Sequence, residues 1–95
     1  MAFEIEVTQE AESDVDKIRP FYRRQILDAV ESHLQHTPTR TSRSRIKRLR
    51  SFQSPEYRLR IGEFRVFYDV DEAKRRVTVL RILSKEEAAK YLEER

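Results

Sequence analysis

The residues best suited to chemistry are three arginines in the segment YRLRIGEFRVFY, Tyr57–Tyr68. Arg58, Arg60 and Arg65 alternate with apolar residues, which is the pattern of a β-strand with one buried face. A guanidinium group can donate two parallel hydrogen bonds to a phosphate, and the ring of Phe67 offers a face on which a base can stack. These residue types at this spacing predict a surface that binds the phosphates of a nucleic acid.

A two-residue turn at Gly62-Glu63 is expected to fold this segment into a β-hairpin, because glycine at the first central position is typical of a type II′ turn. Counting outward from the turn places Arg60 opposite Arg65, with Arg58 on the same face, and like charges at opposed positions destabilise a hairpin. The arginines could be splayed into water, where their repulsion is screened. An anion bound among them accounts better for the arrangement. The other face would then be the core face: Tyr57, Leu59, Ile61, Phe64, Val66 and Tyr68.

Charge is distributed unevenly along the 95 residues. Residues 1–19 carry six acidic and two basic side chains, whereas residues 40–65 carry nine basic and two acidic ones. A basic middle on a chain of net charge +3 suggests a polyanionic partner, although a solvated basic face would have the same composition. Outside the hairpin, the residues of this middle region predicted to contact RNA are Arg45, Lys47, Arg48 and Arg50.

The elements that must position these residues follow the order β-α-α-β-β-β-β-α. We expect a strand at 3–7, a helix capped by Thr8, a helix from Pro20 to about 36, a mobile basic loop at 37–45, an edge strand at 46–49, strands at 57–61, 64–70 and 77–83, and a helix after the capping box at Ser84. The late strands are joined by short turns and must therefore pair antiparallel. With the helices covering one sheet face, the result is a two-layer α+β fold in a single domain, 1–95.

Composition excludes several classes of protein. The hydrophobic fraction of 38% and the charged fraction of 39% predict a small core under a highly charged surface. Since there is no cysteine, disulfides, thiolate catalysis and cysteine-built zinc sites are excluded. No apolar run approaches the roughly 20 residues needed to span a bilayer, and the acidic N-terminus does not have the features of a signal peptide. We therefore expect a cytoplasmic protein without membrane contact.

The segments YRLRIGEFRVFYDV and SKEEAAKYL, with an apolar strand between them, resemble the RelE/ParE superfamily of bacterial type II toxin–antitoxin toxins. The order of elements matches as well, so the resemblance covers nearly the whole chain. The RelE branch consists of endoribonucleases that cut mRNA, typically on the ribosome, and so inhibit translation. They use no metal or cofactor, because the 2′-OH of the RNA attacks the adjacent phosphodiester. The resemblance implies this activity, together with a cognate antitoxin whose C-terminal segment wraps the toxin.

The resemblance also implies the catalytic positions, which are Arg58, Arg60, Arg65, Lys85 and Tyr91. The strand positions that are often lysine in RelE-like enzymes are arginine here, and arginine is a poor general base. Lys85 stands where arginine is common. Lys85 and Tyr91 lie six residues apart, which puts them on different sides of a regular helix, and Tyr91 could equally be a core residue. Arg81 is a further candidate for RNA contact.

Two other functions remain open. A ParE-type toxin has the same fold but poisons DNA gyrase without cutting RNA, and an inactive relative would bind RNA without toxicity. His33 and His36 are types of residue that ribonucleases use, but both are expected at the end of the second helix, away from the arginines. A partly positive imidazole suits the negative end of a helix dipole, so we expect no catalytic role for either.

Overall fold

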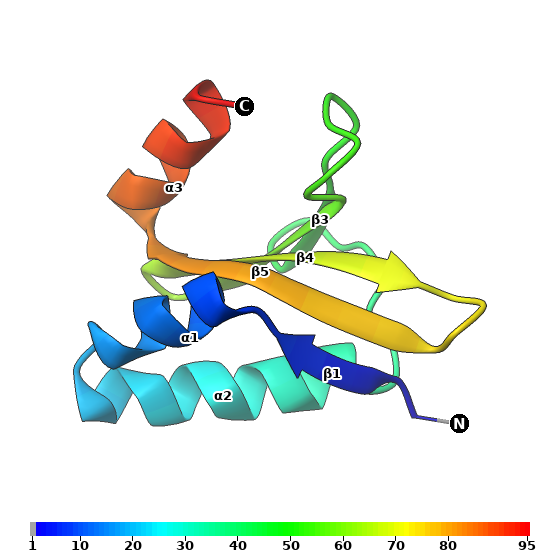
Figure 1. The fold of residues 1–95 in the computed structure, drawn as a ribbon, viewed down its shortest axis with the longest axis horizontal. Coiled ribbons are helices and arrows are strands. Elements are labelled where there is room, and N and C mark those ends of the chain that lie inside the picture. Colours follow the sequence, from blue (N-terminus) through cyan, green and yellow to red (C-terminus); the bar gives the residue numbers. More distant parts are fainter. Residues whose placement is uncertain (1) are drawn as a thin grey trace.

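The computed structural model describes residues 2–95, which form a five-stranded sheet and three helices (Figure 1). The elements are β1 (Glu4–Val7), α1 (Gln9–Asp16), α2 (Pro20–Leu34), β2 (Ile46–Arg48), β3 (Tyr57–Ile61), β4 (Phe64–Asp71), β5 (Arg76–Ser84) and α3 (Lys85–Glu93). The strand order is β1-β5-β4-β3-β2, with β1 parallel to β5 and the other pairs antiparallel. The predicted α+β fold class and order of elements are confirmed, including the short strand β2 at the edge of the sheet.

Helices α1 and α2 cover one face of the sheet (Figure 1). Helix α1 begins where the Thr8 hydroxyl accepts a hydrogen bond from the backbone of Ala11, and α2 begins at Pro20. The core between helices and sheet contains the predicted hairpin face, with Leu59, Val66 and Tyr68 fully buried. On α2 the side chains of Ile26, Val30 and Leu34 face this core, whereas the side chain of Leu27 is 49% exposed.

Helix α3 lies on the opposite face of the sheet, contrary to the expectation that all helices cover one face (Figure 1). It begins at the predicted capping box, in which Ser84 and Glu87 bond reciprocally through side chain and backbone. A second, smaller core cluster forms beneath it from Leu49, Phe67, Leu83 and Ala88, with Phe52, Tyr91 and Leu92 packed against it. The reason lies in β5, whose apolar residues face both sides.

A bulge in β5 sends its apolar residues to both faces. Phe67 pairs with Arg81 but Tyr68 pairs with Val79, so β5 has one extra residue at Leu80. The extra residue shifts by one the alternation of β5 side chains between the two faces of the sheet. Val77 and Val79 face the larger core before the bulge, and Ile82 faces it after the bulge, while Leu83 enters the smaller cluster.

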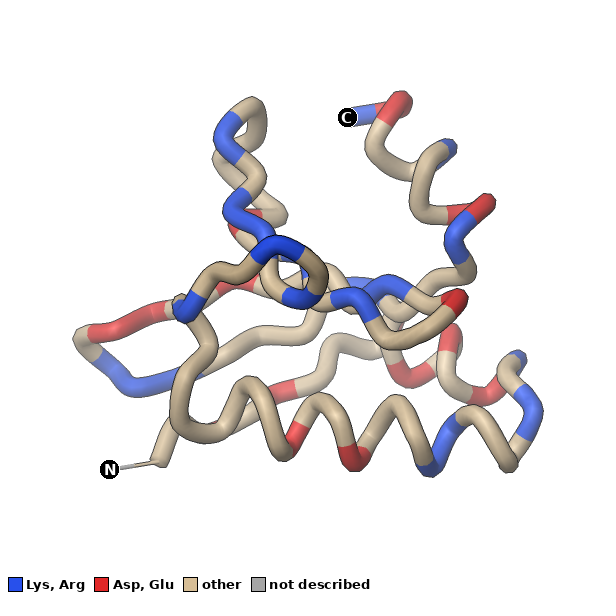
Figure 2. Tube along the Cα trace, turned by 180° about the vertical axis from the view of Figure 1, so that it is seen from behind, with Lys and Arg blue, Asp and Glu red and all other residues tan. Residues whose placement is uncertain are grey.

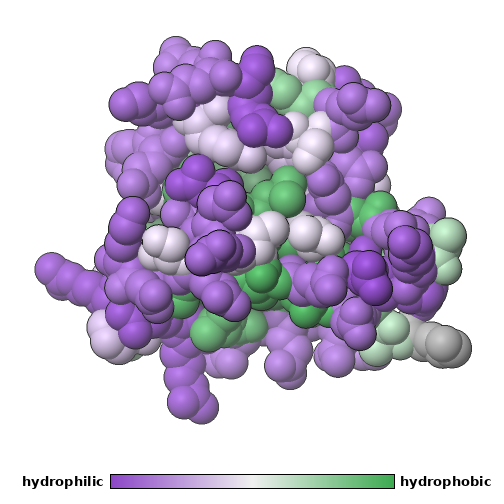
Figure 3. Space-filling view, in the orientation of Figure 1, coloured by the Kyte–Doolittle hydropathy of each residue, from purple (hydrophilic) through white to green (hydrophobic). Residues whose placement is uncertain are grey.

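The segment 37–45 contains no helix or strand, as expected. It is nevertheless attached to the core, because Pro38 is fully buried and its carbonyl accepts a 2.6 Å hydrogen bond from the Tyr68 hydroxyl. The rest of the segment is exposed. Its arginines are among the blue stretches of the tube in Figure 2. The surface in Figure 3 is mainly hydrophilic, with apolar side chains in small areas between charged ones. Between residues 2 and 95, no helix has the length and apolar character that a bilayer-spanning segment requires.

Candidate nucleic-acid interface

The β3–β4 hairpin has the predicted register at every position. Arg60 lies opposite Arg65, Leu59 opposite Val66 and Arg58 opposite Phe67. Gly62 has a φ of 56° and Glu63 has a negative φ, as a type II′ turn requires. The turn therefore places the three arginines on one face of the sheet, the face away from α1 and α2.

The three guanidinium groups interact through their charges. The pKa of Arg58 is lowered, first by burial and then by repulsion from Arg65 and Arg60. The pKa of Arg65 is also lowered, by burial and by Arg60, although Glu63 and Glu86 partly offset this. Within residues 2–95, none of the three arginines forms an ion pair with a carboxylate. The site is therefore a cluster of positive charge that nearby glutamates offset only in part, and such a cluster favours the approach of an anion.

The three arginines differ in exposure and in hydrogen bonding. Arg60 is exposed, whereas Arg58 is half-buried and its Nε has no hydrogen-bond partner within the described chain. Arg65 is buried, with 8% of its surface exposed, and its Nη1 donates to the carbonyls of Gly62 and Phe64 at 2.9 Å. Arg65 thus holds the turn as well as contributing charge.

Phe67 does not offer a stacking face, which corrects the sequence-based prediction. The ring is fully buried in the cluster under α3, with its centroid 5.0 Å from that of Tyr91. A residue in the centre of a sheet is covered as soon as a helix packs on its face, and the sequence did not show that α3 would do so. A base bound near the arginines would contact another group.

The basic residues near β2 lie in different places. Lys47 is exposed and lies opposite Arg58, so it extends the arginine face, and Arg50 is exposed beyond β2. Arg48 donates to the carbonyls of Leu49 and Glu56 and lies 4.0 Å from the Glu56 carboxylate. It is therefore engaged within the protein rather than free for RNA.

Arg45 also points away from the arginine face. Its Nη1 lies 3.1 Å from Nε2 of His33, near the end of α2. The pKa of His33 is lowered, by burial first and then by Arg45. Burial and, after it, the guanidinium of Arg45 both disfavour the charged ring of His33, contrary to the partly positive imidazole expected at this position.

Lys85 and Tyr91 are not on one side of α3. Lys85 is exposed at the first position of the helix, and its backbone N–H donates to the carbonyl of Glu63, which ties it to the hairpin turn. Tyr91 is half-buried between the guanidinium groups of Arg81 and Arg95, whose Cζ atoms lie 5.6 and 5.1 Å from its ring centroid. Burial is the main cause that raises the pKa of Tyr91.

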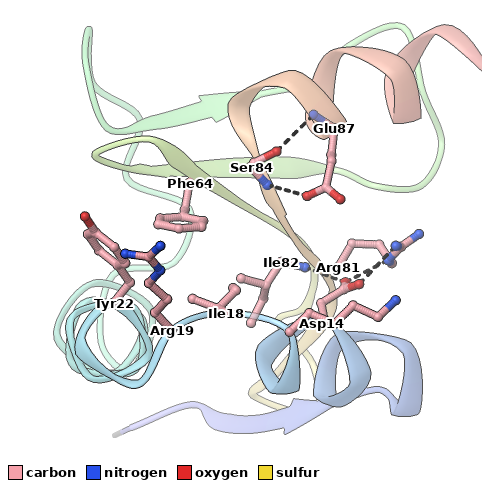
Figure 4. Close-up of a pocket in the computed structure, with 10 residues that line it drawn as sticks. Asp14, Ile18, Arg19, Tyr22, Phe64, Arg81, Ile82, Ser84 and Glu87 are labelled. Carbon is pink, nitrogen blue, oxygen red and sulfur yellow. Dashed lines mark hydrogen bonds and ion pairs between the residues drawn. The ribbon is translucent and has the colours of Figure 1, made fainter.

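Arg81 is engaged by a residue that the sequence analysis did not single out. The carboxylate of Asp14, which is only 7% exposed, accepts hydrogen bonds from Nε and Nη2 of Arg81 at 2.8 and 3.0 Å (Figure 4). The bonds to Asp14 are the main reason that the pKa of Arg81 is raised. No local sequence pattern identifies this pair, since the two residues lie 67 positions apart in the chain.

A pocket of about 340 Å³ opens beside this pair (Figure 4). Its apolar wall contains Ile18, Tyr22, Phe64 and Ile82, and its polar wall includes Arg19, Ser84 and Glu87. In the described part of the chain, no three His, Cys, Asp or Glu side chains are grouped so as to hold a metal ion.

The fold is that of a small α+β domain, and three arginines without ion pairs in the described residues lie on one face of its β3–β4 hairpin. The model of the ParE toxin family of type II toxin–antitoxin systems (parDE) matches residues 5–89. The chain therefore belongs to this family, and it is a type II toxin of the RelE/ParE superfamily.

Solved structures show the same fold. The toxin–antitoxin complex RelBE2 from Mycobacterium tuberculosis contains a chain that is 23% identical, with a TM-score of 0.77, 88% of this chain covered and 99% of that one. The RelE–RelB complex from Pyrococcus horikoshii gives 16% identity, a TM-score of 0.71 and coverages of 88% and 96%. The isolated RelE toxin from Escherichia coli is 18% identical, with a TM-score of 0.60, and the match covers 96% of this chain and 99% of that one. A comparison with curated protein sequences finds no match.

Proposed function

We propose that this toxin is an mRNA endoribonuclease whose arginine face binds the scissile phosphate. The observation that carries the proposal is the cluster of Arg58, Arg60 and Arg65, in which burial and mutual repulsion lower the pKa of two members while no carboxylate pairs with any of them in the described residues. A protein that keeps like charges together without a counter-ion gains from an anion that binds among them.

The reaction proposed is an internal transfer in the RNA. The 2′-oxygen forms a bond to the adjacent phosphorus, the bond from phosphorus to the 5′-oxygen breaks, and the products carry a 2′,3′-cyclic phosphate and a 5′-OH. The phosphate gains negative charge in the transition state, which Arg58 and Arg60 would stabilise. A base must remove the 2′-OH proton and an acid must protonate the 5′-oxygen. Lys85 and Tyr91 are the proposed proton-transfer groups, and arginine, which stays protonated, supplies charge alone.

The proposal is tested by expressing the toxin from a tightly repressed promoter and mapping the 5′ ends of mRNA in a translation extract. Wild type should produce new 5′-OH ends, and Arg60→Ala should reduce them by at least tenfold, because Arg60 is exposed and its loss leaves the fold intact. Arg43→Ala, an exposed arginine of the 37–45 segment, is the matched control and should cut normally. Equal cutting by wild type and Arg60→Ala would refute the role of the arginine face. Comparison of extracts with and without ribosomes tests whether cutting occurs on the ribosome.

DNA gyrase inhibition is the second candidate, and the match to the ParE toxin family favours it. Strand β3 also favours it, because it has arginine at positions where RelE-like enzymes often have lysine, and arginine is a poor general base. Gyrase-dependent DNA breaks without new RNA ends would support this alternative. Unchanged supercoiling in the presence of purified toxin would exclude it.

We also propose a cognate antitoxin as the partner. The similar structures from M. tuberculosis and P. horikoshii are complexes with antitoxins, which supports this. Two features of the chain would suit an antitoxin segment with acidic and apolar side chains: the arginine face, and the exposed apolar residues Phe21, Tyr22 and Leu27 on α2. Co-expression with the product of the neighbouring gene should relieve toxicity and give a complex that survives gel filtration. Separate elution of the two proteins would contradict the proposal.

A further inference from the structure

The starting observation is a buried acid on α1, at the edge of the sheet that α1 covers. Strand β1 pairs with β5 only as far as Val79, so the outer edge of β5 is left without a strand partner beyond that residue. Asp14 fills part of this gap, because its Oδ2 accepts a 2.9 Å hydrogen bond from the backbone N–H of Ile82. The same carboxylate holds Arg81 by two further hydrogen bonds (Figure 4). Both carboxylate oxygens are therefore engaged by two consecutive residues of β5.

Arg81 reaches Asp14 from the face of the sheet that carries α3. The bulge at Leu80 puts Arg81 opposite Phe67, on the same face as the arginine cluster. From there its guanidinium lies over the ring of Tyr91, with Cζ 5.6 Å from the ring centroid. The Tyr91 ring in turn packs on Phe67. A continuous chain of contacts thus leads from α1 through Arg81 to α3.

We infer that Asp14 is a positioning residue that fixes Tyr91 and helix α3 over the arginine face by holding Arg81. Without this acceptor, the guanidinium of Arg81, whose side chain is 34% exposed, would lose the two charge-assisted hydrogen bonds that hold it near Tyr91 and could extend into water. Tyr91 would then lose one of the two cations that flank it, and α3 would be held by its small apolar cluster and its cap. The inference rests on the proposed function where it concerns cleavage, and on the fold alone where it concerns the placement of α3.

The first test measures amide hydrogen exchange in the full chain. Asp14→Asn should raise exchange of the α3 amides around Tyr91 at least tenfold more than exchange of the slow amides in β4. Asp16→Asn is the matched control, because it makes the same change on the same helix at an exposed position. An equal rise in α3 and β4 would show loss of global stability only and would overturn the inference, as would unchanged exchange in α3.

The second test uses RNA cleavage. Asp14→Asn should lower kcat about tenfold and leave KM within twofold, because the arginines that would bind the phosphate are untouched. In a Tyr91→Phe background the same substitution should have no further effect on kcat, since the hydroxyl that Asp14 positions is already absent. A full additional loss in that background would overturn the inference, because Asp14 would then act through other groups.

A variant that fails to fold does not end the test. Arg81→Gln leaves Asp14 bonded to the N–H of Ile82 and removes the guanidinium alone, so it should give the same rise in α3 exchange and the same loss of kcat. If wild type cuts no RNA at all, the proposed function fails, and hydrogen exchange in Asp14→Asn and Arg81→Gln decides the positioning role by itself.

Discussion

Replacing Arg58 with methionine should make the free toxin more stable while it weakens RNA binding. Methionine keeps an unbranched apolar stem in the half-buried site and removes the charge. In the wild type, the buried Nε of Arg58 has no hydrogen-bond partner among residues 2–95, and both Arg65 and Arg60 repel the guanidinium. These are costs to the folded state that the substitution relieves.

The size of the effect follows from these two contributions. An unsatisfied buried donor costs about 1–3 kcal/mol, and the lower end applies here because the side chain is partly exposed to solvent. Repulsion from two neighbouring arginines adds a few tenths of a kcal/mol each. The expected gain is about 1–1.5 kcal/mol, and each kcal/mol raises Tm by roughly 4–8 °C in a domain of this size.

Thermal denaturation of wild type and Arg58→Met, at low salt and in 1 M NaCl, measures this directly. The repulsive part of the gain should shrink in 1 M NaCl, where screening acts over about 3 Å. The variant should also lose about one unit from the slope of log affinity for RNA against log salt concentration. Arg43→Met, in the exposed loop, should change Tm little. A lower Tm for Arg58→Met would refute the reasoning, because it would mean that Arg58 has a stabilising partner in the free protein.

Three further predictions concern stability and titration. Tyr68→Phe should lower the free energy of unfolding, measured by urea denaturation, by about 1–3 kcal/mol, because the carbonyl of buried Pro38 loses its hydrogen-bond donor. An unchanged free energy of unfolding would mean that another group donates to this carbonyl. Gly62→Ala should lower the free energy of unfolding by about 1–2 kcal/mol, because φ at this position is 56°, even though the new Cβ would meet no neighbouring atom. Equal stability of the two proteins by calorimetry would contradict a strained turn. His33 should titrate below pH 6.5 by NMR, and Arg45→Gln should move that pKa upward. Because folding lowers this pKa, the contribution of His33 to stability is complete above pH 6.5 and is lost as pH falls through the folded-state pKa. The urea midpoint of wild type should therefore fall on acidification relative to that of His33→Gln. A midpoint that rises instead would contradict the prediction.

The amino-acid sequence alone determined the hairpin. Alternation of apolar and charged residues over 57–68, with a glycine at the turn, allows only one register that buries a complete face, and a shift by one residue would expose that face. For the same reason, the positions of Arg58, Arg60 and Arg65 could be predicted. The capping box at Ser84 and the proline that opens α2 are likewise local signals, because the groups that bond or restrict the backbone lie within a few residues.

Only the tertiary structure decided what surrounds the arginines. A bulge at Leu80 changes the phase of β5 after Val79, and this places Arg81 on the arginine face and Leu83 under α3. Once α3 packs there, Phe67 is buried and cannot stack on a base. The partner of Arg81, Asp14, comes from the opposite end of the chain. Local patterns fix local pairing, but packing between distant segments fixes which side chains remain free, and that depends on the whole core forming together.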